Sequence, residues 1–142
     1  MKPLLLLLFL SSAFLLSCQP ANSQEKASKE SLATKAAPGE VISVVLSQDD
    51  FRAKMAELGA GIQLVDVRRP DEFREGHIEG ALNINFLEDD FSQQMERQVN
   101  KEKPVMLYCR SGSRSASAAE ELKALGFKEI YDLEGGFLDW QE

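Results

Sequence analysis

Short apolar segments alternate with helix-like segments along residues 40–142 of this 142-residue chain. The apolar segments are β-branched or nearly continuous, which is typical of strands, and amphipathic or polar stretches separate them. Strands that alternate with helices favour a parallel sheet, because each crossover helix packs back onto the sheet. The sequence therefore predicts an α/β fold with an open, mainly parallel sheet and helices on both faces.

The predicted elements follow from this pattern and from the residues that begin and end each segment. Ser47 begins the first helix in a capping-box pattern, and Gly126 ends the last. Apolar residues at helical spacing mark the buried faces of the first and third helices. Strands are predicted at 41–46, 62–67, 104–109 and 129–133, and residues 77–85 are predicted to form a loop and a third strand. Helices are predicted at 47–58 with Phe51, Met55 and Leu58 buried, at 69–75, at 87–99 with Phe91, Met95 and Val99 buried, and at 115–126.

The most apolar predicted strand, residues 104–109, ends at a cysteine. A near-continuous apolar strand is expected where both faces of a parallel sheet are covered. Ligands of open α/β sheets bind at the carboxyl ends of the strands. Cys109 stands at that end, directly before a predicted helix. We therefore expect the functional site at the loop that begins with Cys109.

The loop CRSGSRS, residues 109–115, has the composition of a thiolate site. A cysteine acts as a nucleophile only as thiolate, so its pKa must be lowered for work near neutral pH. Loop N–H groups, the positive end of the next helix and two arginines would each favour the thiolate. The alternative is a buried structural cysteine followed by a polar turn. The two arginines and the glycine that follow within five residues argue against such an inert cysteine. The candidate substrate-binding residues are Arg110, Ser111, Gly112, Ser113, Arg114 and Ser115, of which Ser115 could also cap the helix.

This loop resembles the active-site loop of a single-domain rhodanese. Two further segments resemble motifs of that family: DVR, EF and GHIEGALNI within 66–84, and LEGGF with a following tryptophan within 133–140. Their order and spacing agree over about residues 41–142. Phe137 stands where many members have tryptophan, which is a conservative exchange. The resemblance implies a rhodanese fold, with a five-stranded, mainly parallel sheet flanked by helices, and a persulfide carried by Cys109.

The resemblance also leaves a choice between sulfur and phosphorus as the atom attacked. Related phosphatases use Cys-x5-Arg, a loop that wraps a phosphate. Here the arginine arrives one position earlier, at Arg114, and Ser115 stands in the sixth place after Cys109. The shorter loop encloses a smaller volume, which suits a terminal sulfur better than a tetrahedral oxyanion. This spacing favours sulfur transfer over phosphatase or arsenate-reductase activity.

The expected function is sulfur transfer by a ping-pong mechanism. Cys109 would take a sulfane sulfur from a small anionic donor such as thiosulfate, which Arg110 and Arg114 would contact. Cyanide, a small thiol or a protein cysteine would accept it. We expect a monomer that uses no cofactor. The alternative is a sulfur-carrier or redox-sensing binding module that acts only with a dedicated partner protein.

Other polar residues are assigned supporting or structural roles. Asp66 and Arg68 are expected to brace neighbouring loops near the site, and His77 is expected to be structural. The acidic run 88–90 is interpreted as a solvated helix start. Ligand spacings typical of a metal site are not apparent in the sequence. A net charge of −7 argues against nucleic acid as a partner.

The N-terminal 39 residues have the features of an export signal followed by a linker. Residues 1–17 contain an apolar stretch too short to span a bilayer, and they precede Cys18 as in a bacterial lipoprotein signal. Residues 18–39 lack aromatic residues and are interpreted as a disordered, lipidated tether. Lipidation of Cys18 would place the domain, residues 40–142, in the periplasm on a membrane. Gln19 favours the outer membrane, because it is not the aspartate of an inner-membrane retention signal.

Overall fold

Five parallel strands form one sheet in the computed structural model, which describes residues 40–140. The predicted signal peptide, Cys18 and the whole predicted tether, residues 18–39, lie outside these residues. The strand order is β1-β5-β4-β2-β3, so β4 lies in the middle and β1 and β3 form the edges. The strands are β1 (Ile42–Leu46), β2 (Gln63–Asp66), β3 (Leu82–Asn83), β4 (Val105–Tyr108) and β5 (Glu129–Leu133). The predicted parallel α/β fold is confirmed.

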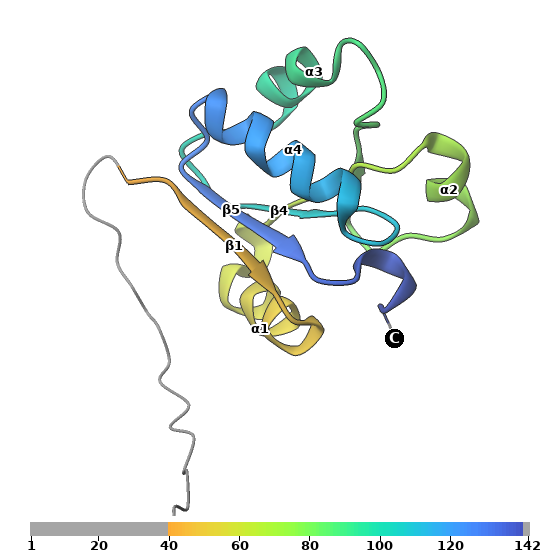
Figure 1. Ribbon diagram of the computed structural model, residues 1–142. Coiled ribbons are helices and arrows are strands. Elements are labelled where there is room, and N and C mark those ends of the chain that lie inside the picture. The colour runs from red at the N-terminus through yellow and green to blue at the C-terminus, as the bar shows by residue number, and fades with distance from the viewer. Residues whose placement is uncertain (1–39, 141–142) are drawn as a thin grey trace, which may run out of the picture. The chain divides into compact units, whose positions relative to one another are not determined.

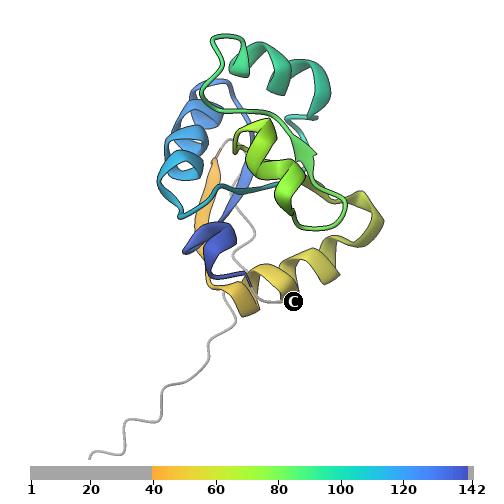
Figure 2. The same ribbon diagram turned by 90° about the vertical axis from the view of Figure 1, so that its right-hand side faces the viewer.

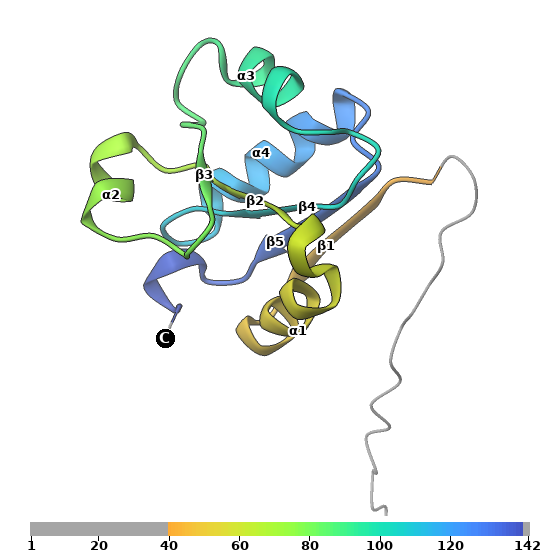
Figure 3. The same ribbon diagram turned by 180° about the vertical axis from the view of Figure 1, so that it is seen from behind.

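Helices cover both faces of the sheet (Figures 1 and 3). Helix α1 (Gln48–Leu58) packs on one face, and α3 (Phe91–Gln98) and α4 (Ser113–Ala124) pack on the other. Helix α2 (Pro70–Glu75) and the 3₁₀ turn η2 (Gly136–Leu138) gather with the start of α4 at the carboxyl ends of the strands (Figure 2). A second 3₁₀ turn, η1 (Gly59–Gly61), follows α1. No helix within residues 40–140 has the length and apolarity needed to cross a membrane.

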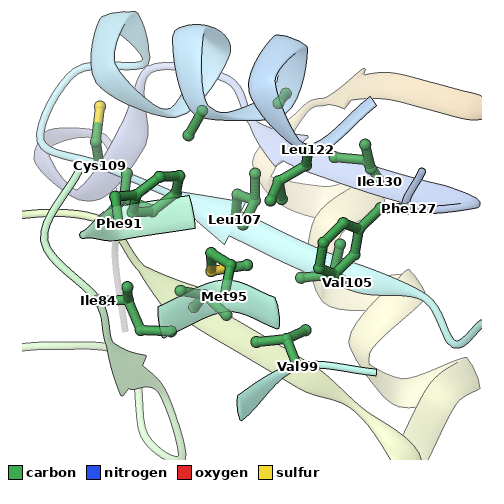
Figure 4. Packing of buried hydrophobic residues seen from close by; sticks show 14 residues of the cluster. Ile84, Phe91, Met95, Val99, Val105, Leu107, Cys109, Leu122, Phe127 and Ile130 are labelled. Carbon is green, nitrogen blue, oxygen red and sulfur yellow. The ribbon is translucent and has the colours of Figure 1, made fainter. Parts of the chain in front are cut away.

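Strand β4 divides the core into two clusters because its side chains alternate between the two faces. Leu107 packs toward α3 and α4, whereas Met106 and Tyr108 pack toward α1. All four residues of β4 are fully buried, as expected for the central strand of a doubly covered sheet. Figure 4 shows the first cluster, which contains the predicted buried face of α3 and ends at Cys109. The predicted apolar face of α1 lies in the second cluster.

The third strand lies within the predicted loop and strand, and it pairs with β2 only at Leu82 and Asn83, after a turn with positive φ at Gly80. Two predicted helix boundaries are wrong. Helix α3 begins at Phe91 and not near residue 87, since turns centred on Asn85 occupy the preceding residues. Helix α4 begins at Ser113, two residues early. Its N-cap is Gly112 at φ 93°, so Ser115 lies inside the helix and does not cap it.

The turn η2 is docked against the backbone that follows β4. The amide of Phe137 donates to the carbonyl of Cys109 at 2.8 Å, and that of Leu138 donates to the carbonyl of Arg110 at 3.0 Å. Gly136 has φ 64°, and a Cβ there would lie 2.5 Å from the Cys109 carbonyl oxygen. A glycine is therefore required for both the conformation and the close approach.

We predict that Gly136→Ala destabilises the protein more than Gly80→Ala does. Gly80 also has positive φ, but open space surrounds the position of its missing Cβ. Gly80→Ala should cost about 1–2 kcal/mol, the conformational cost of a left-handed residue. Gly136→Ala should cost roughly 1–3 kcal/mol more, because the added methyl overlaps backbone atoms. Denaturant unfolding measures both values, and equal losses would contradict the docking described above.

Candidate active site

Cys109 follows β4 directly and is almost completely buried, with 1% of its surface exposed. Its sulfur points toward the loop at the start of α4 (Figure 4). The backbone N–H of Gly112 donates to Sγ at 3.2 Å, and the hydroxyl of Ser115 lies 3.5 Å from Sγ. Both donors stabilise a negative sulfur more than a neutral one. The loop thus curls around the thiol as the sequence predicts.

The start of α4 lies at the same place. Because Gly112 caps the helix with a positive φ, the chain reverses within three residues of Cys109 and enters the helix at once. The first N–H groups of a helix lack partners within the helix and carry a partial positive charge. They therefore add to the potential that favours a thiolate or a persulfide anion at this position.

Arg114 is held by a partner that lies 42 positions earlier in the chain. Its two terminal nitrogens donate to the two carboxylate oxygens of Glu72 on α2, at 2.8 and 2.9 Å. Hydrogen bonding to Arg114 lowers the pKa of Glu72 to about 2, so the pair stays ionised throughout the neutral range. Glu72 also accepts from the backbone N–H of Arg69 and thereby caps α2. Arg114, which the sequence predicts to contact an anionic donor, thus lies near the loop, but its guanidinium is paired with the carboxylate of Glu72.

Asp66 and Arg68 form a buried ion pair beneath this region. Nε and Nη2 of Arg68 donate to the carboxylate of Asp66 at 2.7–3.0 Å, and Nη2 also donates to the carbonyl of Gly76 at 2.6 Å. The guanidinium lies 4.1 Å from the ring centroid of Phe137. Arg68 therefore joins the end of β2, the end of α2 and the turn η2. These contacts match the bracing role expected from the sequence.

A pocket of about 380 Å³ opens beside the loop. Three arginines line it, and two of them are paired with carboxylates: Arg68 with Asp66, and Arg69 with Asp71 and Glu72. The third, Arg110, is exposed and makes no ion pair within residues 40–140. It is the pocket arginine best able to meet an incoming anion. The lining residues are Arg68, Arg69, Glu72, Glu75, Gly76, Arg110, Phe137 and Leu138.

The remaining predicted residues lie at the rim or away from the sulfur. Ser111 and Ser113 are exposed, and neither hydroxyl bonds to another described residue. His77 is exposed, stacks on the ring of Phe73 and hydrogen-bonds its carbonyl at 3.0 Å. Its place in the α2 turn is structural and gives it no contact with Cys109. In the described part of the chain, no group of acidic, histidine or cysteine residues forms a metal site.

Sequence reasoning missed Asp132, which lies on β5 beside the site. It is 4% exposed, and its Oδ1 has no hydrogen-bond partner among the described residues. Burial raises its pKa to about 6 from the usual 3.8. The available signal was an acidic residue within the otherwise apolar run IYDL. That signal does not reveal which face of the sheet the residue occupies.

We predict that ionisation of Asp132 makes the free energy of unfolding depend on pH. A folded-state pKa above the unfolded value means that this residue imposes no penalty below about pH 4, where both states are protonated. As pH rises through about 6, the free energy of unfolding falls by up to about 3 kcal/mol. Asp132→Asn should recover this loss. Denaturant unfolding at several pH values measures the difference.

Glu134→Gln is the matched control, because Glu134 is an exposed acid at the end of the same strand. Its effect on unfolding should be small at every pH. A difference between wild type and Asp132→Asn that stays constant from about pH 4 to about pH 8 would contradict the buried, titrating carboxyl group.

Comparison with known proteins assigns this arrangement to a family. The chain is 41% identical over 80 residues to thiosulfate sulfurtransferase GlpE of Coxiella burnetii, covering 56% of this chain and 72% of that protein. It is 35% identical over 122 residues to thiosulfate sulfurtransferase 18 of Arabidopsis thaliana, covering 78% and 86%. A rhodanese-like domain protein from Staphylococcus aureus shares the fold with a TM-score of 0.60 at 30% identity, covering 69% and 91%. The family model of the rhodanese-like domain matches residues 47–142, so this chain belongs to the rhodanese-like family.

Proposed function

We propose that this protein is a sulfurtransferase that carries a sulfane sulfur on Cys109 and takes it from a small anionic donor such as thiosulfate. The observation that carries the proposal is the hydrogen bond from the Gly112 N–H to Sγ at the start of α4. Two relatives bear the name thiosulfate sulfurtransferase, which supports the donor class.

The reaction has two displacement steps. The Cys109 thiolate attacks the outer sulfur of thiosulfate, the S–S bond of the donor breaks, and sulfite leaves with the bonding electron pair. Cys109 then carries a persulfide whose outer sulfur bears the negative charge. A thiophilic acceptor such as cyanide, a thiol or a protein cysteine attacks that outer sulfur and releases the Cys109 thiolate again.

The loop supplies the stabilisation that both steps require. In the resting site the Gly112 N–H already points at Sγ. The outer sulfur of a persulfide would lie further along the same loop, among N–H groups that start α4. Preorganised N–H donors stabilise charge without reorganising during the reaction. Burial of Cys109 excludes water from the sulfur, which protects a reactive persulfide.

The state of Arg114 favours sulfur over phosphorus. A phosphate-transferring loop needs an arginine that faces the tetrahedral oxyanion, whereas Arg114 makes a two-point contact with Glu72. Opening that pair would leave the Glu72 carboxylate without its main partner. A terminal sulfur carries one negative charge and needs no such arginine. We therefore propose that Arg114 fixes the start of α4 to α2, and that Arg110 meets the donor.

We predict that treatment with thiosulfate adds the mass of one sulfur atom to the wild-type protein and that Cys109→Ser abolishes this gain. Intact mass measurement under non-reducing conditions detects the persulfide. Steady-state assay with thiosulfate and cyanide then separates a turnover enzyme from a carrier, which would load readily but turn over slowly. If wild-type protein gained no sulfur from any tested donor, the proposed reaction would be wrong.

We predict that Arg110→Gln raises the KM for thiosulfate about tenfold with little change in kcat. A hydrogen bond to a charged group is worth about 1.5–3 kcal/mol, which corresponds to about a tenfold change or more. Arg74→Gln is the matched control, because Arg74 is an exposed arginine on α2 outside the pocket lining. Equal KM values for the two variants would remove Arg110 from the donor site.

We further propose that Cys18 is lipidated and anchors the domain to a membrane on the periplasmic side. The support is the apolar segment that precedes Cys18 in the sequence. In bacterial expression, wild-type protein should partition into the detergent phase, and Cys18→Ser should move it to the aqueous phase. Cys109→Ser is the control and should stay in the detergent phase. Aqueous partitioning of mature wild-type protein would refute the anchor.

A further inference from the structure

The pocket beside the active loop has α2 on one side and η2 on the other (Figure 2). The amide of Leu138 donates to the carbonyl of Arg110 at 3.0 Å, so η2 and the loop lie side by side. At the end of α2, a Cβ added to Gly76 would lie 3.6 Å from the ring of Phe137. Nη2 of Arg68 donates to the Gly76 carbonyl at 2.6 Å. These contacts fix the backbone on both sides of the pocket.

Two charged groups of opposite sign remain free in this pocket. Arg68, Arg69 and Glu72 are held in ion pairs. Arg110 of the loop and Glu75, the last residue of α2, also line the pocket and are exposed. Neither side chain makes an ion pair or a hydrogen bond in the described part of the chain. The pocket therefore offers one cation and one carboxylate to a ligand.

The sulfur donor gives the Glu75 carboxylate no role. Thiosulfate is a dianion, and a carboxylate in the same pocket repels it. The pocket volume of about 380 Å³ lies in the range of sites for small organic molecules and is larger than an inorganic anion requires. A ligand of the second half-reaction, the sulfur acceptor, accounts for both the volume and the carboxylate.

We propose that the acceptor is a small thiol that carries both an ammonium and a carboxylate group. Glu75 binds the ammonium group. Arg110 binds the carboxylate after sulfite has left, so one cation serves both half-reactions. Leu138, which is 61% exposed beside Arg110, contacts the methylene groups of the acceptor. The proposal rests on the proposed sulfur transfer and adds Glu75 as a residue that determines acceptor specificity.

The transfer step conserves atoms and electrons. The acceptor reacts as thiolate, having released its proton to solvent, and attacks the outer sulfur of the Cys109 persulfide. The S–S bond to Cys109 breaks, and its electron pair stays on Cys109 as thiolate. The acceptor leaves as a persulfide, so the step needs no oxidant or reductant. Glu75 and Arg110 only orient the charged groups of the acceptor.

The first test measures how fast different thiols discharge the Cys109 persulfide of the full-length protein, read by intact mass. The acceptors are free cysteine, mercaptopropionate, which lacks the ammonium group, and cysteamine, which lacks the carboxylate. Glu75→Gln should slow discharge by cysteine and cysteamine about threefold, the size of an exposed ion pair, and should not slow discharge by mercaptopropionate. Arg110→Gln, loaded in advance, should slow cysteine and mercaptopropionate but not cysteamine.

Glu79→Gln is the matched control, because Glu79 is an exposed acid outside the pocket lining and the change in net charge is the same. It should alter each rate less than about twofold. Each acceptor is compared with itself between variants, so differences in thiol pKa between acceptors cancel. An equal effect of Glu75→Gln on all three acceptors, or no effect on any, would overturn the proposal.

A second test needs no sulfur transfer. Methanethiosulfonate reagents modify the Cys109 thiolate, which attacks their sulfenyl sulfur and expels methanesulfinate. At the Cys109 peptide, read by mass spectrometry, Glu75→Gln should slow the cationic aminoethyl reagent about threefold relative to the neutral methyl reagent, whereas Glu79→Gln should not. If no donor loads the protein, the proposed function fails, but this ratio still reports the pocket. A ratio that Glu75→Gln leaves unchanged would overturn the assignment of Glu75.

Discussion

Two backbone hydrogen bonds between the turn η2 and the peptides after Cys109 hold the active loop in shape. They run from the amides of Phe137 and Leu138 to the carbonyls of Cys109 and Arg110. With those carbonyls turned toward η2, the chain reverses and the Gly112 N–H points at the sulfur. Gly136 is what permits this approach, since any side chain there would overlap the loop backbone. The hydrogen bond from Gly112 to the Cys109 sulfur thus depends on a turn that lies 27 residues later in the chain.

Ion pairing then determines which arginine side chains near the loop are available to bind an anion. The Glu72–Arg114 pair ties α2 to α4, and the Asp66–Arg68 pair ties β2 to α2 and η2. Both pairs are largely shielded from solvent, so breaking one partner leaves a costly buried charge. Arg114 and Arg68 therefore have a structural role in holding these elements together. Arg110 remains exposed at the pocket, so the residue proposed to meet a donor anion is not one of the arginines that hold the loop.

Local patterns in the sequence predicted the features that depend on neighbouring residues. The apolar run ending at Cys109 and the apolar faces of α1 and α3 were predictable because burial imposes their periodicity. The parallel direction of the strands was predictable because strands and helices alternate along the chain. The start of α4 was not, since Gly112 adopts the positive φ that lets the helix begin earlier than the Ala-rich segment indicates.

Contacts between distant parts of the chain could not be predicted. The spacing of Arg114 from Cys109 indicated a short loop. The sequence could not show that Arg114 pairs with Glu72, because the two residues meet only when α2 and α4 pack together. Asp132 was missed for the same reason: whether it faces Cys109 or α1 depends on strand register. A charged residue within an apolar strand indicates a candidate buried polar group. Only the tertiary structure shows which residues surround it.

The measurement that tests the central claim most directly is a crystal structure of the protein after reaction with thiosulfate. The account predicts one extra sulfur bonded to Cys109 Sγ, with loop N–H groups of residues 110–115 within about 3.5 Å of it. The Arg114–Glu72 pair should remain closed. An unmodified Cys109 beside an oxyanion held by an Arg114 released from Glu72 would contradict this account.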